Sequence, residues 1–492
     1  MNSVISPVAL MATIIAYFFM LFLISYKTSK GADTQTFFTA KRESPWYLVA
    51  FGMIGASLSG VTFVSVPGWV ADSQFSYLQM VFGYLMGYLV IATVLMPMYY
   101  RMNLTSIYTY LDERFGFVSY QTGAAFFILS RTIGAAFRLY LVAVVIQRFV
   151  MAYYGIPFWL TVAMTILLIW VYTFRGGIKT IVWTDTLQTL CMLLAVICTI
   201  FAIGQAMDLS LAGLVDTVKA SPYSQVFYFE GGWGDSKNFF KQFLAGAFMA
   251  IVMTGLDQDM MQKNLTCKSI GDAQKNMFWF SIVLVLANIL FLSLGALLYV
   301  YSAQLGVAIP ERSDLLYPTI AFNHLPGFVS ILFILGLIAA AYSSADSALT
   351  SLTTSFCVDI LGFGKKGRTE SQKKKTRQLI HISFSVLLFI VILIFYGINN
   401  EAVISAIFKV AMYTYGPLLG LYAFGFFTQG AVIDKLVPLV CLASPFLTYI
   451  INANSENWLG GYKFGFELLL LNGLITFLGL ALLYKNKKRH TS

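Results

Sequence analysis

The sequence predicts an all-α polytopic membrane protein. Hydrophobic residues make up 58% of the 492 residues, charged residues make up 11%, and the mean hydropathy is +0.76. A soluble protein of this length could not expose so apolar a surface. Apolar runs of about 20 residues, the length that crosses a hydrocarbon core, recur from end to end. We therefore expect about thirteen transmembrane helices in one membrane domain, residues 1–492.

The expected helices follow one another with short connections. The first run ends in Tyr26-Lys27 with no small-residue cleavage site, so residues 1–30 are interpreted as a retained extra helix and not as a signal peptide. The apolar runs begin near residues 7, 46, 76, 120, 156, 179, 239, 275, 326, 378, 402, 431 and 464.

Positive charge is unevenly distributed among the connections. If the first helix runs from outside to inside, the predicted cytoplasmic segments hold 22 of the 32 lysines and arginines. The positive-inside rule then places the N-terminus outside and the C-terminus in the cytoplasm. Basic runs such as Lys373-Lys374-Lys375 are interpreted as topology signals that contact membrane lipids, not nucleic acid. Compact loops and short tails favour a bacterial inner (plasma) membrane.

The sequence offers no enzymatic machinery. The five cysteines are scattered singly, and the three histidines lie far apart with no HExxH pattern. No nucleophile with a base and no phosphate-binding loop is evident. We therefore expect no catalytic residues, no cofactor and no site for a catalytic or structural metal.

Two apolar spans contain polar residues together with helix breakers, at Gly55–Gly60 and at Thr254–Asp259. Irregular backbone at membrane depth is tolerated only where it lines protein or a cavity. The two breaks fall in the second and seventh expected helices, the spacing of a 5+5 inverted repeat. The first repeat would cover residues 46–206 and the second 236–428, with two C-terminal helices and a short cytoplasmic tail at 431–492. For Gly52, Gly60, Gly83 and Gly87, close helix packing is the alternative explanation.

Hydroxyl side chains are concentrated in the apolar span Gly336–Ser355. Sodium is a hard cation that oxygen ligands bind well. Ser343 and Ser347 are one helical turn apart and Ser344 is adjacent, while Gly55 and Leu58 could add carbonyls from the broken helix. Asp185 could supply a carboxylate, and Asp346 needs a cation, a proton or an arginine partner. The alternative is that these hydroxyls bond to their own helix backbone.

The solute is expected beside the broken helices. Polar and aromatic side chains there favour a sugar or another hydroxylated solute, because buried hydroxyls need partners. Arg131 and Arg138 lie on one helical face, and a buried arginine would instead favour a carboxylate, although each could be a structural partner of an acidic residue. The candidate solute-binding residues are Ser57, Ser59, Thr62, Gln79, Arg131, Asp257, Gln258 and Tyr413.

Several short motifs together resemble the sodium/solute symporter family, which includes sodium/glucose cotransporters and bacterial proline and sialic acid carriers. They are Ala340-Ala-Tyr-Ser343-Ser344 with Ser347, Arg175-Gly-Gly-Ile with Trp183-Thr-Asp185 and Gln188, Asp257-Gln258 with Gln262-Lys263, and Lys409 followed by Tyr413-Thr-Tyr415-Gly-Pro417. The resemblance covers essentially the whole chain. It implies a leucine-transporter-type fold and sodium-coupled import by alternating access.

The resemblance also implies site residues. One sodium site would use Gly55, Leu58, Ala340, Ser343 and Ser344. A second, known for some members, would use Asp185, Ser343, Asp346 and Ser347, but Asp346 stands where those members have a hydroxyl residue. The arginine that holds the carboxylate in sialic acid carriers aligns with Gly134, one turn from Arg131.

The expected function is therefore sodium-coupled symport of a small polar organic solute, with a sugar or sugar acid favoured, by a protein that works as a monomer. A proton-coupled carrier, or a carrier of small carboxylates or amino acids with the same fold, is the alternative. A transporter-like sensor is a third reading, disfavoured because only a short tail follows the last helix.

Overall fold

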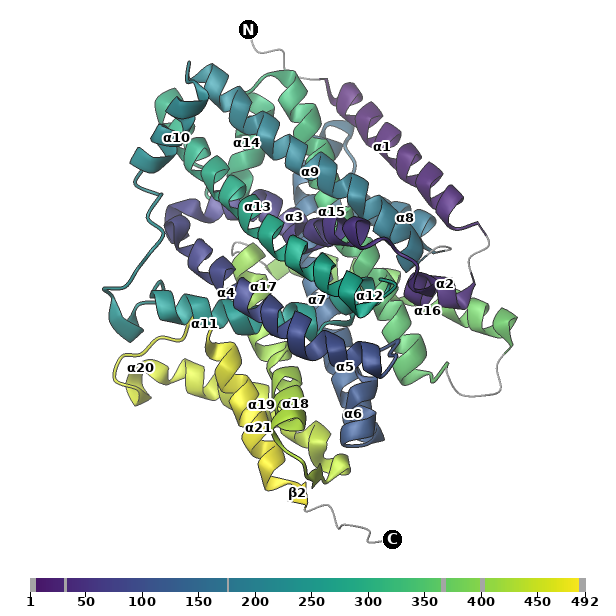
Figure 1. Cartoon of the computed structure of the whole chain (residues 1–492). Coiled ribbons are helices and arrows are strands. Elements are labelled where there is room, and N and C mark those ends of the chain that lie inside the picture. Colours follow the sequence, from purple (N-terminus) through teal and green to yellow (C-terminus); the bar gives the residue numbers. More distant parts are fainter. Residues whose placement is uncertain (1–5, 31–32, 175–176, 364–368, 399–402, 486–492) are drawn as a thin grey trace.

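The computed structural model describes residues 6–30, 33–174, 177–363, 369–398 and 403–485 and is helical almost throughout (Figure 1). The motif residue Arg175 lies outside the described residues. The helices are α1 (Pro7–Thr28), α2 (Thr34–Thr39), α3 (Trp46–Ser73), α4 (Tyr77–Val90), α5 (Met96–Arg101), α6 (Thr109–Arg114), α7 (Phe117–Phe149), α8 (Phe158–Thr173), α9 (Ile178–Ala206), α10 (Leu211–Ala220), α11 (Phe239–Ala250), α12 (Gln258–Asn264), α13 (Ile270–Leu305), α14 (Leu316–Asn323), α15 (Gly327–Ser355), α16 (Glu370–Ile398), α17 (Val403–Thr414), α18 (Gly416–Phe427), α19 (Val437–Ala453), α20 (Ser455–Trp458) and α21 (Leu468–Leu482). Two short strands, β1 (Ala431–Val432) and β2 (Tyr484–Lys485), pair antiparallel near the end of the described chain.

Among the described residues, eight helices are long and apolar enough to cross a membrane, or up to ten if each of two bent pairs counts as one span. One of the eight is the continuous stretch Trp46–Arg101 of 56 residues, in which Gln74 has a φ of 51° at the end of α3. Two shorter apolar helices, α8 and α21, bring further apolar length. An integral membrane protein is thus confirmed, while the count of about thirteen spans stays a prediction.

The centre of the molecule is built from α3, α9, α13 and α15, which pack against one another. Figure 1 shows α1 along one edge, beside α8 and α9, and α19 with α21 at the opposite edge. Helices α4 and α11 lie so close together that a Cβ atom at Gly83 or Gly87 would collide with the α11 backbone. These two glycines therefore serve close packing, as the alternative explanation held.

Two central helices are broken at the expected places. In α3, Ser59 has φ 49° and ψ 171°, far from helical geometry. After α11, a short π-helix (Ile251–Gly255) and two non-helical residues precede α12. The axis of α12 is bent by 69° relative to the helical segment before the break. Asp257 caps α12 by accepting the backbone N–H groups of Asp259 and Met260. Each break leaves backbone carbonyls without helical partners at the level of the site.

Candidate functional site

A cavity of ≈ 100 Å³ lies beside the broken part of α3. Its walls come from α3, α4, α7, the α11–α12 break, α13 and α17. Four of the candidate solute-binding residues line it: Ser57, Ser59, Thr62 and Arg131. Residues that the sequence did not single out line it too, among them Tyr77, Tyr84, Tyr88, Asn288 and Phe408. An alternating polar and aromatic wall at membrane depth is typical of a binding site for a small solute.

The other four candidate solute-binding residues lie elsewhere. Gln79 is bound to the backbone of Lys237 and Tyr228 in the loop before α11. Gln258 accepts from the Ile107 N–H and donates to the Thr105 carbonyl.

Asp257 and Tyr413 are likewise held by other groups. Tyr415 donates its hydroxyl to Asp257, with 2.5 Å between the oxygens. The half-buried Tyr413 accepts a hydrogen bond from Asn452 at 3.2 Å. These residues connect helices and loops around the cavity, and none of them is among its lining residues.

The two arginines of α7 differ in their partners. Arg131 forms a buried ion pair with Asp259 of α12. Arg138 lines the same cavity, is only 8% exposed, and forms no ion pair within the described part of the chain. Its Nε atom is buried without a hydrogen-bond partner. The cavity therefore contains one guanidinium whose charge is compensated and one whose charge is not.

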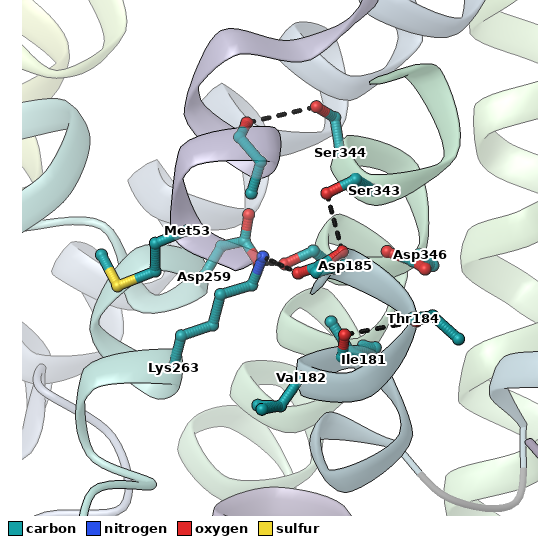
Figure 2. Close-up of polar contacts among 12 residues, drawn as sticks. Met53, Ile181, Val182, Thr184, Asp185, Asp259, Lys263, Ser343, Ser344 and Asp346 are labelled. Carbon is teal, nitrogen blue, oxygen red and sulfur yellow. Dashed lines mark hydrogen bonds and ion pairs between the residues drawn. The ribbon is translucent and has the colours of Figure 1, made fainter. Parts of the chain in front are cut away.

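The expected first sodium site brings α3 and α15 together. Ser344 donates its hydroxyl to the Ala56 carbonyl at 3.2 Å, across the two helices (Figure 2). Ser343 lies next to Gly55, because a Cβ atom added at Gly55 would be 3.4 Å from the Ser343 hydroxyl. Gly55, Leu58, Ala340, Ser343 and Ser344 are all buried. The break at Ser59 removes the N–H groups that would otherwise occupy the preceding α3 carbonyls.

Asp185 of α9 joins this group through an ion pair that sequence analysis did not predict. Lys263 of α12 donates to one Asp185 oxygen at 2.6 Å, and Ser343 donates to the other at 2.7 Å. Figure 2 shows the Lys263 ammonium and the Ser343 hydroxyl converging on this carboxylate. Both residues belong to the motifs quoted for the family resemblance, but nothing in the sequence paired them, because they lie 78 residues apart.

The other residues of the expected second sodium site are directed to different partners. Ser347 donates to Asp259, the carboxylate that Arg131 neutralises. One oxygen of Asp346 accepts from the Tyr172 hydroxyl at 2.9 Å, and the other is buried with no hydrogen-bond partner in the described part of the chain. The carboxylates of Asp185, Asp259 and Asp346 thus have three different sets of partners.

On the side of the cavity that is expected to face outside, aromatic side chains pack against one of its lining residues. Phe466, in the segment before α21, contacts the cavity residue Phe408 with 4.9 Å between ring centroids, and also contacts Trp69. The adjacent Glu467 forms a buried ion pair with Lys241 at 3.1 Å. A segment that an ion pair fastens to α11 therefore packs against one wall of the cavity.

The features described above, two broken helices around a polar cavity and a hydroxyl-rich helix beside them, define a membrane transporter. The family model "Sodium:solute symporter family" matches residues 37–437. The chain belongs to this family and is therefore a sodium-coupled transporter, not an enzyme.

Relatives and solved structures agree with this assignment. The sodium/sialic acid symporter NanT of Aliivibrio fischeri is 25% identical over 461 residues, which cover 92% of this chain and 88% of that protein. The sodium/sialic acid symporter SiaT of Proteus mirabilis is 24% identical, with 88% of each chain covered. A substrate-bound, outward-open structure of a Na⁺-coupled sialic acid symporter superimposes with a TM-score of 0.82 at 20% identity, covering 97% of this chain and 99% of that one. The predicted leucine-transporter-type fold is confirmed.

Proposed function

We propose that this protein imports a hydroxylated solute bearing one carboxylate, a sugar acid, together with sodium by alternating access. The carboxylate is inferred from Arg138. This buried guanidinium lines the cavity and forms no ion pair in the described chain. A buried cation is costly unless it is paired. A solute carboxylate would supply the missing charge through a planar two-point contact. The names of the two relatives, both sialic acid symporters, favour the same solute class.

The hydroxyl-bearing walls suit the rest of such a solute. Ser57, Ser59, Thr62 and Asn288 line the cavity together with the tyrosines. Solute hydroxyls that leave water need replacement partners, which these side chains offer. In this proposal Arg131 acts through Asp259 as a positioning residue. Gln79, Asp257, Gln258 and Tyr413 would support the walls from outside the cavity.

For the coupling ion, we propose the carbonyls of Gly55, Leu58 and Ala340 with the hydroxyls of Ser343 and Ser344. Oxygen ligands of this kind suit a hard cation. Sodium would join α3 to α15, the two helices already linked by the Ser344 hydrogen bond. A second sodium at Asp185, Asp346 and Ser347 would have to draw Asp185 away from Lys263.

The proposed setting is a bacterial inner membrane, with the N-terminus outside, the C-terminus in the cytoplasm, and a monomer as the working unit. The excess of lysine and arginine in the predicted cytoplasmic segments supports the orientation.

The test is uptake into proteoliposomes with an inward sodium gradient, using radiolabelled sialic acid, a neutral hexose and a small monocarboxylate. Wild-type protein is expected to accumulate the sugar acid only with sodium. In Arg138→Gln this uptake should fall by a factor of about ten or more, on the order of one lost charge-assisted contact. In Ser344→Ala the sodium gradient should no longer increase uptake. Uptake of the hexose alone, unchanged in Arg138→Gln, would overturn the carboxylate assignment.

A further inference from the structure

An apolar groove of ≈ 380 Å³ lies between α8 and α16 and shares no lining residue with the solute cavity. On α8 it is lined by Ala163, Ile166, Leu167 and Trp170, and on α16 by Ile382, Ser385, Val386 and Phe389. Both sets follow helical spacing, so each helix presents one stripe to the groove. The volume lies within the range of pockets that hold a single small ligand.

The two helices run antiparallel along the groove, which fixes its ends. Thr173 of α8 contacts His381 of α16 at 3.1 Å, whereas Phe158 stacks on Tyr396 with 4.0 Å between ring centroids. Trp170 therefore lies toward the N-terminal end of α16. Its indole nitrogen is buried and has no hydrogen-bond partner among the described residues. An unpartnered donor therefore belongs to the residue at this end of the groove.

The same end of α16 is strongly basic. Lys375 precedes Ile382 by seven residues, two helical turns, so it lies on the groove side of α16 about 10 Å beyond the groove. Lys374 is its neighbour, and both side chains are exposed. The nearby Glu370 is bonded to Lys373, and neither Lys374 nor Lys375 forms an ion pair in the described chain. Two uncompensated ammonium groups therefore stand over one end of the groove.

We propose that this juxtaposition, an apolar groove ending at Trp170 beneath Lys374 and Lys375, is a binding site for one anionic phospholipid. One acyl chain lies in the groove between α8 and α16. The headgroup phosphate lies against the two lysines, and the Trp170 N–H donates to an oxygen of the lipid. Charge complementarity selects this occupant, because an apolar groove alone would accept any chain, and basic sites at the cytoplasmic ends of helices attract anionic headgroups. The site is independent of the identity of the transported solute.

Native mass spectrometry of the purified full-length protein tests the proposal. The protein is titrated with phosphatidylglycerol and, separately, with phosphatidylcholine carrying the same acyl chains. The wild type is expected to retain one phosphatidylglycerol in preference to phosphatidylcholine by a factor on the order of ten, the contribution of about one to two interfacial lysines. Lys374→Ala/Lys375→Ala should lose the preference between the headgroups. Lys268→Ala/Lys275→Ala, a pair of exposed lysines at the start of α13, should keep it.

A groove variant tests the apolar part separately. Ala163→Phe fills the groove and should lower retention of both lipids. If this variant does not fold, the lysine pair still decides the question. Equal retention of the two lipids by the wild type would overturn the proposal, as would a preference that survives in Lys374→Ala/Lys375→Ala. A wild-type dimer that becomes monomeric in Ala163→Phe would also overturn it, because the groove would then hold a second copy of the chain.

Discussion

Arg131 and Arg138 are seven residues apart on α7, yet their surroundings give them different tasks. Arg131 is bound to Asp259, so its charge contributes to holding α12 against α7. Arg138 faces the cavity without an acidic partner in the described chain. The same residue type on one helical face can therefore be structural at one position and available to a ligand at the next.

The difference predicts opposite effects on stability. Arg131→Met leaves Asp259 buried without its partner and is expected to cost about 3–5 kcal/mol, seen as a lower thermal unfolding midpoint in detergent. Arg138→Met removes an uncompensated buried charge and should leave the midpoint unchanged or raise it. The double variant Arg131→Met/Asp259→Asn should recover part of the loss. Equal destabilisation by Arg131→Met and Arg138→Met would show that Arg138 has a structural partner.

The sequence could not predict which side chains of the site contact one another across helices. The hydroxyls of Ser343 and Ser344 and the breaks near Ser59 and Asp257 could be expected from local patterns, because they depend on neighbouring residues. The ion pair between Lys263 and Asp185 joins residues 78 positions apart, and no spacing rule foretells it. Gln79, Gln258 and Tyr413 were polar residues in apolar spans, and the sequence could not tell whether they face the cavity or support a loop.

At the scale of elements, α3 depends on one residue in a rare conformation. Ser59 has φ 49° and ψ 171°, a region that only glycine enters readily and that costs other residues about 1–3 kcal/mol. The break matters because it turns a spanning helix into two halves whose ends meet at the site. The break near α12 uses ordinary backbone regions and a cap instead, so the two broken helices are built by different means.

The backbone of Ser59 gives a second prediction. Ser59→Gly should keep the broken shape and raise the thermal midpoint, because glycine enters this conformation without steric cost. Ser59→Val should lower it, since a β-branched side chain is strained there. Ser57→Val, two residues away in helical geometry, serves as the control for adding the same side chain to the cavity wall. Equal loss in both valine variants would assign the effect to packing and not to backbone conformation.

At the scale of the whole molecule, sodium is expected to stabilise the protein by joining α3 to α15. A ligand that binds only the folded state at 100 times its dissociation constant contributes about 2.7 kcal/mol. The thermal midpoint should therefore rise with NaCl and not with choline chloride of equal ionic strength. Ser344→Ala should lose the shift. Ser330→Ala, on the same helix but bonded to the Ala321 carbonyl, should retain it, and the same loss in both variants would contradict the site.

The overall architecture was more predictable than the site, for a physical reason. Membrane-spanning helices must satisfy their backbone internally, so their existence and order are visible in apolar length alone. The number of spans is harder to predict, because α8 and α21 are short and because Trp46–Arg101 is one continuous helical stretch despite the polar residues within 72–76. Lipid-facing positions carry little pattern, which is why the groove between α8 and α16 could only be found in three dimensions.

The small cavity changes how solute affinity should be understood. At ≈ 100 Å³ it is below the ~300 Å³ of ordinary ligand pockets, and the Phe466 segment packs against its lining residue Phe408. The solute must therefore bind to a more open arrangement, and a measured dissociation constant is the intrinsic one divided by the fraction of molecules that are open. A substitution that breaks the ion pair between Lys241 and Glu467 would then lower the apparent dissociation constant without adding a contact to the solute. Selection for affinity could therefore act on residues that never touch the solute.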